Sequence, residues 1–217
     1  MGLSLPQGTE PRKCFRDPIP EILDAARYLD AAVSAHLAGH VTLAQMFIEH
    51  ANMRVIREWT ESIWGKQTQE RKYVFYRKVD GAPAYLKSVV ARMPPVRDQR
   101  LLHARDGYHC RFCGIPVIRP DVRNALRRAY PIARIWGTKN TDQHAALQAM
   151  WAQYDHIVPH SRGGNNSLEN LVVTCAPCNF GRMEYTLEEV GLLDPRAREV
   201  RHSTWDGLER MLPSRRI

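Results

Sequence analysis

The first third of the chain repeats apolar residues with the period of an α-helix. Between residues 19 and 37 they are spaced three or four positions apart, at Ile22, Ala26, Leu29, Val33 and Leu37. This spacing places them on one face of an amphipathic helix. Asp17-Pro18 predicts the start of that helix, and Gly39 predicts its end.

The same period predicts two further helices, at residues 42–51 and 52–64. In the second of them we expect four residues to face inward: Val55, Ile56, Trp59 and Ile63. Residues 17–65 therefore form a small helical unit. We expect Trp64, like Trp59, to belong to the core of this unit and not to a surface on which nucleic-acid bases stack.

After residue 66 the apolar runs become shorter and mix strand and helix patterns. Residues 72–81 (KYVFYRKVDG) predict a short strand that ends in an Asp-Gly turn. Helices are expected within 96–110, at 119–130 and at 142–150, the last capped by Thr141, and two short ones within 187–212. The runs AQYDHIVPH and LVVTC predict two strands joined by a Gly163-Gly164 turn, with a helix starting at Asn179. This mixture predicts the α+β class.

Basic residues are concentrated in the middle of the 217-residue chain. The whole sequence holds 31 Lys and Arg against 23 Asp and Glu, a net charge of +8, and residues 91–154 hold 11 basic residues against 4 acidic ones. Because guanidinium groups suit phosphate oxygens, this block is typical of a nucleic-acid binder, with a solvated basic face as the alternative. The arginines that we expect to contact nucleic acid are Arg111, Arg123, Arg127, Arg128, Arg162 and Arg182.

Four of the five cysteines form two C-x-x-C pairs, Cys110/Cys113 and Cys175/Cys178. Two such pairs predict a four-cysteine zinc site whose closed shell is structural, with redox chemistry as the main alternative. Cys14 has no partner in this pattern, and we expect a plain thiol there. The long separation between the pairs indicates an insertion, at residues 115–150.

Candidate reactive residues surround the second C-x-x-C pair. Asp155 and Asn179 offer the oxygen ligands that Mg²⁺ or Mn²⁺ prefers, and His156 can accept a proton from water near neutral pH. Asp155 and His156 are adjacent in a strand, so they share one site only if the strand end bends or both sides of a cleft take part. Arg182, one helical turn after Asn179, could hold a phosphate. Together these groups suit phosphodiester hydrolysis.

This stretch resembles the HNH endonucleases, a family with a ββα-metal fold. The resemblance covers residues 96–184 and rests on an Asp-His pair, a Gly-Gly turn, an Asn, a C-x-x-C and a final Asn: Asp155, His156, Gly163, Gly164, Asn170, Cys175, Cys178 and Asn179. The stretch RDGYHCRFCG, at residues 105–114, is similar to the first zinc knuckle of the zinc-bearing members.

The resemblance implies a role for each matching residue. His156 would be the general base, Asp155 and Asn179 would bind one catalytic metal, and Asn170 would fix the loop and orient His156. The last letter of the motif is Asn179 where a His is common, so this is an H-N-N variant in which metal preference could differ. We expect no role for His160 beyond its place in the loop, although a phosphate or metal contact stays open.

We therefore expect a helical N-terminal region at residues 1–90 and a nuclease domain at residues 91–217. The activity expected is metal-dependent cleavage of DNA, and RNA is not excluded because phosphate contacts carry no base information. The alternatives are a zinc-stapled nucleic-acid-binding module without activity and an RNase or toxin-like effector. The N-terminal helices could bind a protein partner or form a dimer. No apolar run suits a membrane span or a signal peptide, so we expect a cytoplasmic location.

Overall fold

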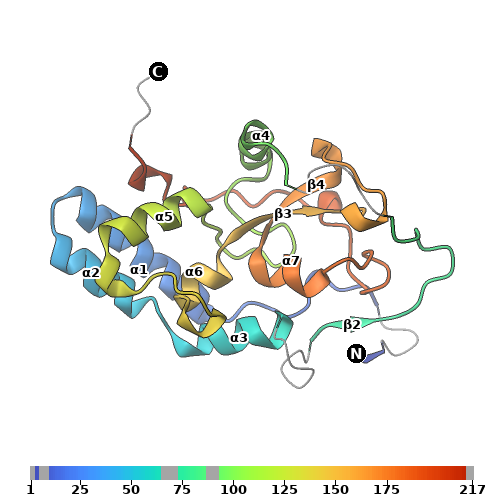
Figure 1. Cartoon of the computed structure of the whole chain (residues 1–217), viewed down its shortest axis with the longest axis horizontal. Helices are drawn as coiled ribbons and strands as arrows, with labels where there is room; N and C mark the ends of the chain where they lie inside the picture. The colour runs from blue at the N-terminus through green and yellow to red at the C-terminus, as the bar shows by residue number, and fades with distance from the viewer. Residues whose placement is uncertain (1–2, 5–9, 65–72, 87–92, 214–217) are drawn as a thin grey trace.

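The computed structural model describes residues 3–4, 10–64, 73–86 and 93–213, and it combines helices with two small sheets (Figure 1). The helices are α1 (Pro20–Leu37), α2 (Val41–His50), α3 (Arg54–Trp64), α4 (Val96–Asp106), α5 (Pro120–Ala129), α6 (Ala145–Ala149) and α7 (Ala176–Arg182). The strands β1 (Leu3–Ser4) and β2 (Phe75–Tyr76) pair in parallel, and β3 (Ala152–His156) and β4 (Leu171–Cys175) pair antiparallel. This mixture agrees with the expected α+β class. Of the strand expected at 72–81 only β2 is found, and residue 72 lies outside the described residues.

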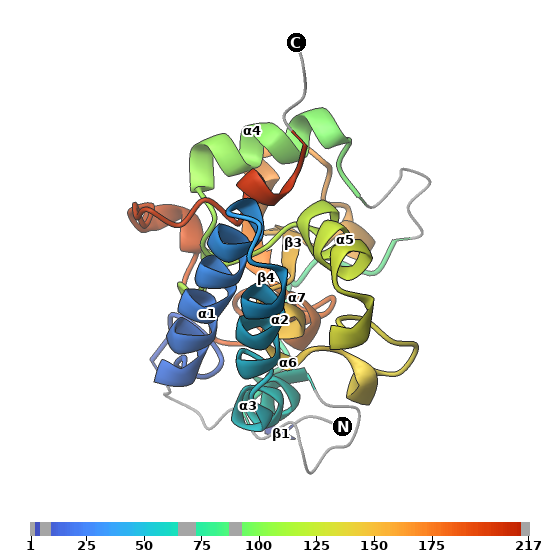
Figure 2. The ribbon, with the colours of Figure 1, turned by 90° about the vertical axis from the view of Figure 1, so that its left-hand side faces the viewer.

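The three N-terminal helices follow the apolar period closely. α1 and α2 lie side by side (Figures 1 and 2), and Gly39, with a φ of 82°, lets the chain reverse between them. Pro20 stands in the first turn of α1, so the helix begins after the expected Asp17-Pro18. Two residues expected inside are exposed, Leu37 at 57% and Val55 at 39%, because both stand at the end of a helix.

Residues on both sides of position 90 belong to one hydrophobic core. α3 packs against α6 and α7, and α1 also packs against α6. Two polar contacts join α2 and the turn after it to the start of α6: His144 donates from Nε2 to the carbonyl of Ile48 at 2.8 Å, and Asn52 accepts from the amide of Ala145 at 2.8 Å. The N-terminal helices therefore hold the insertion and α7 in place.

The insertion is less helical than the sequence indicated. In place of a helix over 142–150 it has a 3-10 turn at Asn140–Asp142 and the short α6. The side chain of Gln143 bonds both the amide and the carbonyl of Gly137, at 3.1 and 2.9 Å, and so closes a loop where a helix was expected to start. The N-cap of α6 is therefore His144, whose Nδ1 accepts from the amide of Leu147 at 3.3 Å.

The two helices expected within 187–212 are also absent, and the described part of this segment holds only 3-10 turns at Pro195–Ala197 and Glu209–Met211. The segment instead runs along the first C-x-x-C turn. Arg111 donates to the carbonyls of Pro195, Arg198 and Glu199, at 2.7, 2.6 and 3.0 Å. These long-range bonds replace the local bonds of a helix. None of the described helices is both long and apolar enough to cross a membrane.

Candidate active site and metal centre

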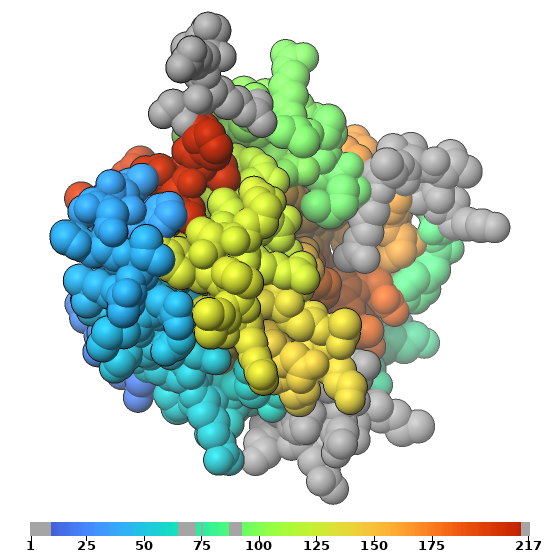
Figure 3. Space-filling model, turned by 60° about the vertical axis from the view of Figure 1, so that its left-hand side comes forward, coloured from blue at the N-terminus to red at the C-terminus, as the bar shows by residue number. Residues whose placement is uncertain are grey.

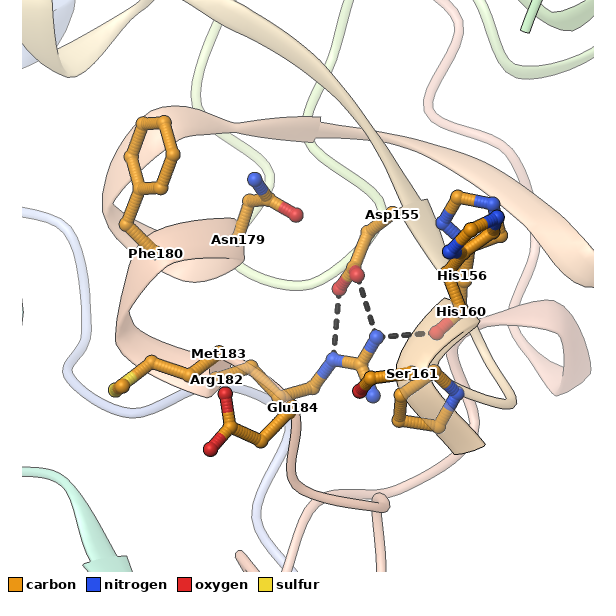
Figure 4. Close-up of a pocket in the computed structure, with 10 residues that line it drawn as sticks. Asp155, His156, His160, Ser161, Asn179, Phe180, Arg182, Met183 and Glu184 are labelled. Atoms are coloured by element: carbon orange, nitrogen blue, oxygen red, sulfur yellow. Dashed lines mark hydrogen bonds and ion pairs between the residues drawn. The ribbon is translucent and has the colours of Figure 1, made fainter. Parts of the chain in front are cut away.

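The hairpin of β3 and β4, together with α7, brings Asp155, His156 and Asn179 to one cavity (Figure 4). β4 continues directly into α7, and the antiparallel pairing sets the start of β3, at Ala152, opposite Cys175. The end of α7 contacts the end of β3, where Arg182 bonds Asp155. Adjacent strand residues point to opposite faces, yet Asp155 and His156 both reach the cavity because β3 ends at His156. The cavity has a volume of about 280 Å³ and is lined by Asp155, His156, Pro159, His160, Ser161, Asn179, Phe180, Arg182, Met183 and Glu184.

Asp155 forms a buried ion pair with Arg182. Nε of Arg182 donates to Oδ2 at 2.8 Å, and Nη2 donates to Oδ1 and to the carbonyl of His156. Asp155 is 4% exposed and Arg182 is 1% exposed. Nη1 donates to the carbonyl of Tyr185 at 2.8 Å, so the guanidinium ties the end of β3 to the chain that leaves α7. This arrangement fixes the direction of the carboxylate.

His156 is oriented by a residue that the sequence did not single out. Its Nε2 lies 2.7 Å from Oδ1 of Asn166, and since an amide oxygen only accepts, Nε2 carries the proton. In the neutral ring the lone pair then lies on Nδ1. The ring of His160 lies near, with its centroid 5.4 Å from that of His156. Nothing in the sequence distinguished Asn166 from Asn165, which accepts instead from the amide of Ser167.

Asn170 closes the loop between the two strands. Its Oδ1 accepts from the amide of Val158 at 2.8 Å, and its Nδ2 donates to the carbonyls of Val158 and Asn165 at 3.1 and 2.9 Å. Its own carbonyl accepts from the amide of Ile157 at 2.8 Å. Asn170 thus holds the backbone directly after His156, which is the kind of contact that the loop-fixing role requires.

The donors in the cavity suit a hard divalent cation. In Figure 4 the amide oxygen of Asn179 points toward the carboxylate of Asp155. Arg182 uses one lone pair on each carboxylate oxygen, and each oxygen has a second one. Carboxylate and amide oxygens are ligands of Mg²⁺ and Mn²⁺, so Asp155 and Asn179 fit this type of ion, which would share Asp155 with Arg182.

The four paired cysteines form a cluster that could hold a metal ion. Their Sγ atoms all lie within 4.8 Å of one another, and Sγ of Cys113 is 3.6 Å from Sγ of Cys175. Tetrahedral zinc with Zn–S bonds of ~2.3 Å separates its sulfurs by ~3.8 Å, so the geometry fits a four-cysteine metal site. All four are free cysteines. In the first turn the amide of Cys113 donates to Sγ of Cys110 at 3.5 Å, and in the second Cys175 is the N-cap of α7.

Burial disfavours the thiolate form of Cys175. It raises the pKa of the Cys175 thiol well above its usual value, because a thiolate is poorly solvated there. A bound metal ion reverses this preference by stabilising the thiolates directly. Cys14 lies outside the cluster, and its Sγ donates to the carbonyl of Arg16 at 3.4 Å.

Three of the six arginines expected to contact nucleic acid bond other parts of the protein, and a fourth, Arg123, is buried. Arg182 bonds Asp155, Arg111 bonds backbone carbonyls, and the Nη2 of Arg162 donates to both carboxylate oxygens of Glu189 at 3.0 and 3.1 Å. Arg123 is 9% exposed and lies over an aromatic ring. The donors of Arg111, Arg162 and Arg182 are therefore directed at the protein and not at an open phosphate-binding surface, which differs from the expectation, whereas Nε and Nη1 of Arg123 have no acceptor among the described residues. The other two, on α5, are exposed: Arg127 and Arg128.

Comparisons with known proteins agree with this geometry. The family model described as HNH endonuclease matches residues 146–189, a segment that includes β3, β4 and α7. No curated protein and no solved structure matches the chain. The matched segment contains Asp155, His156, Asn170 and Asn179 and two of the four clustered cysteines. Residues 146–189 of this chain are thus similar to the HNH endonuclease family.

Proposed function

We propose that the protein is a metal-dependent endonuclease that hydrolyses phosphodiester bonds of DNA. Members of the HNH family are generally nucleases. The observation that carries the proposal is the convergence of Asp155, His156 and Asn179 on one cavity, with His156 already oriented by Asn166. A protein that only binds nucleic acid requires neither a carboxylate nor an oriented imidazole at that place.

In this proposal His156 acts as the general base. Its Nδ1 takes a proton from the attacking water, while the Nε2–H bond to Asn166 stabilises the imidazolium that forms. Asn170 holds the backbone next to His156, so the ring keeps its position during the reaction. General-base catalysis of this kind contributes about 10²- to 10⁴-fold to the rate.

Asp155 and Asn179 hold the catalytic cation, for which we propose Mg²⁺ or Mn²⁺. When bound, the cation supplies charge stabilisation for the phosphate and the leaving oxygen. Arg182 positions Asp155, and its positive charge lies beside the same carboxylate. The four cysteines hold a structural zinc ion, which would anchor a ββα-metal core made of β3, β4 and α7. The exposed Arg127 and Arg128 contact the DNA backbone.

The test is cleavage of supercoiled plasmid by wild type and by His156→Ala, with Mg²⁺, with Mn²⁺ and with no added divalent ion. We expect metal-dependent nicking that falls by at least about 10²-fold in His156→Ala. Parallel reactions with single-stranded RNA of the same sequence separate a DNase from an RNase. Binding without cleavage under every condition would favour the zinc-stapled binding module, and equal loss of binding and cleavage in His156→Ala would make His156 structural.

A further inference from the structure

Four aromatic rings form a continuous series that starts beside the cavity. The ring centroids of Trp64 and Phe180 are 5.0 Å apart, those of Phe180 and Trp151 5.8 Å, and those of Trp151 and Trp136 5.5 Å. The rings come from the end of α3, from α7, from the residue before β3 and from the insertion. We call these four residues the aromatic series.

The aromatic series lies at the border between the core and the surface. Phe180 is 37% exposed, and the other three residues are half-buried, whereas Trp59 in the core is 1% exposed. The expectation that Trp64 is a core residue is therefore corrected. Figure 3 shows the yellow insertion bordering a hollow in the surface, with the orange segment around α7 visible in its depth.

Arg123 lies at the far end of the aromatic series. The guanidinium carbon of Arg123 is 3.8 Å from the ring centroid of Trp136 and 4.9 Å from that of Trp151. Arg123 is nine-tenths buried, and its Nε and Nη1 have no acceptor among the described residues, nor does Nε1 of Trp151. Buried donors without acceptors are unfavourable, so this place suits a ligand that brings acceptor oxygens or nitrogens.

The near end of the aromatic series joins the reaction site. Phe180 lines the same cavity as Asp155, His156 and Asn179. Figure 4 shows Phe180 directly after Asn179 on α7, on the side of the cavity away from His156. A nucleic-acid strand with a phosphate in the cavity would therefore have a neighbouring base close to the Phe180 ring.

We propose that the aromatic series is a stacking site for unpaired bases of the DNA strand that the cavity holds. Every base has an apolar face that stacks on an aromatic ring, and an arginine beside the rings adds donors for base or phosphate oxygens. A paired base is stacked on its neighbours within the duplex and does not offer that face. The substrate class is then DNA with unpaired nucleotides next to the cleaved bond. This inference rests on the proposed nuclease function for its place in a reaction, but it is tested by binding alone.

The test uses Phe180→Leu, which keeps an apolar side chain but removes the aromatic face, and Phe180→Trp, which restores such a face. Both are made in the His156→Ala background, so that binding is measured without cleavage and without a chelator that would strip the cysteine cluster. We expect Phe180→Leu to raise the Kd for a single-stranded oligonucleotide about 5- to 100-fold, and Phe180→Trp to leave it near the starting value. The Kd for the matching duplex should exceed that for the single strand and respond little to either change.

A second readout reports stacking directly. An oligonucleotide with one 2-aminopurine should lose fluorescence on binding, because the base stacks on a ring, and this quenching should disappear in Phe180→Leu and return in Phe180→Trp. Leu43→Ala is the matched control, because Leu43 is an exposed apolar residue on α2, 42% exposed. Equal Kd values and equal quenching in all variants, or tighter binding of duplex than of single strand, would overturn the proposal. If the oligonucleotide stacks on Phe180 but the wild-type protein does not cleave DNA, the nuclease proposal is wrong and the stacking proposal is still supported.

Discussion

Helix α7 and the residue directly before it belong to two sites with different chemistry. Cys175 and Cys178 belong to the four-cysteine cluster, while Asn179 and Arg182 line the cavity. Each pair is spaced three residues apart, and the second pair follows the first by four positions, which is about one helical turn. Cys178, Asn179 and Arg182 therefore lie on one face of the helix, and Cys175, the last residue of β4, stands directly before it.

The two sites differ in how much of a metal ion's ligand shell the protein provides. The cluster offers four soft sulfur ligands that suit a closed tetrahedral shell, which leaves no position for substrate. The cavity offers hard oxygen ligands, and among the described residues that line it Arg182 is the single arginine or lysine. The difference indicates a division of labour in which the closed site fixes α7 against the hairpin and the open site can then hold its reactive groups at defined positions.

Loss of one ligand of the four-cysteine cluster should have the largest effect on stability. In Cys178→Ser we expect loss of bound zinc and loss of cooperative unfolding. The binding free energy of a structural zinc, about 10–16 kcal/mol, is as large as the whole stability of a typical domain, about 5–15 kcal/mol. Zinc content measured by mass spectrometry, together with thermal melting followed by circular dichroism, checks this expectation.

Cys14→Ser is the control for that experiment, since Cys14 is buried like the cluster cysteines but lies outside the cluster. It should keep the full zinc content. If Cys178→Ser melts like wild type and retains its zinc, the four cysteines are not a structural metal site.

Breaking the ion pair between Arg182 and Asp155 in the cavity should have a smaller effect on stability. Arg182→Gln leaves the Asp155 carboxylate buried without its cation, and removing one partner of a buried pair costs about 3–5 kcal/mol. Urea unfolding measures this loss. The double variant with Asp155→Asn should be more stable than the sum of the single losses predicts, because the unpaired charge is then gone.

Arg196→Gln is the matched control on the surface. Arg196 pairs with Asp194, and their side chains are 46% and 35% exposed. Exposed pairs contribute about 0–1 kcal/mol, so this change should be nearly neutral. If Arg182→Gln lowers the unfolding free energy as little as Arg196→Gln does, the buried Asp155 carboxylate does not depend on Arg182.

Many residues of both sites could be predicted from their spacing in the sequence. The C-x-x-C pairs and the order of Asp155, His156 and Asn179 are patterns within short segments, and strands β3 and β4 follow from short apolar runs between turns. Contacts between distant segments could not be predicted in this way. The pairing of Arg182 with Asp155 spans 27 positions, and the contact between Trp64 and Phe180 joins the N-terminal helices to the site. The role of those helices in partner binding or dimerisation stays a prediction.

The C-terminal segment and the insertion show why local patterns fail there. Helices were expected at both places, but side chains of Arg111 and Gln143 bond backbone carbonyls of the same segments and hold them in loops. Asn166 was missed because its amide is distinguished from that of Asn165 only by the imidazole that the fold brings to it.

The last and smallest expected effect is the loss of stability in acid that is due to His144. It distinguishes acid unfolding of the protein from protonation of a group in the cavity. Burial lowers the pKa of His144 to about 4, and in the neutral ring Nε2 donates to Ile48 while Nδ1 accepts from Leu147. The unfolded chain binds a proton at this residue with a pKa of ~6.5, so between pH 6.5 and 4 the unfolded state holds more protons. The stability due to neutral His144 is therefore complete above pH 6.5 and falls by up to about 3 kcal/mol as the pH drops to 4.

His144→Asn keeps an N-cap acceptor but removes the titration, so its unfolding free energy should fall less steeply between pH 6.5 and 4 than that of wild type. Some slope remains because burial also lowers the pKa of His103 to about 4. His40→Gln, at an exposed position, should follow the wild-type curve. Urea unfolding at several pH values measures the slopes, and identical curves for wild type and His144→Asn would exclude His144 as a source of acid sensitivity. A fall in nuclease activity over the same pH range, with no fall in unfolding free energy, would instead place the titrating group in the cavity, where protonation of His156 removes the base.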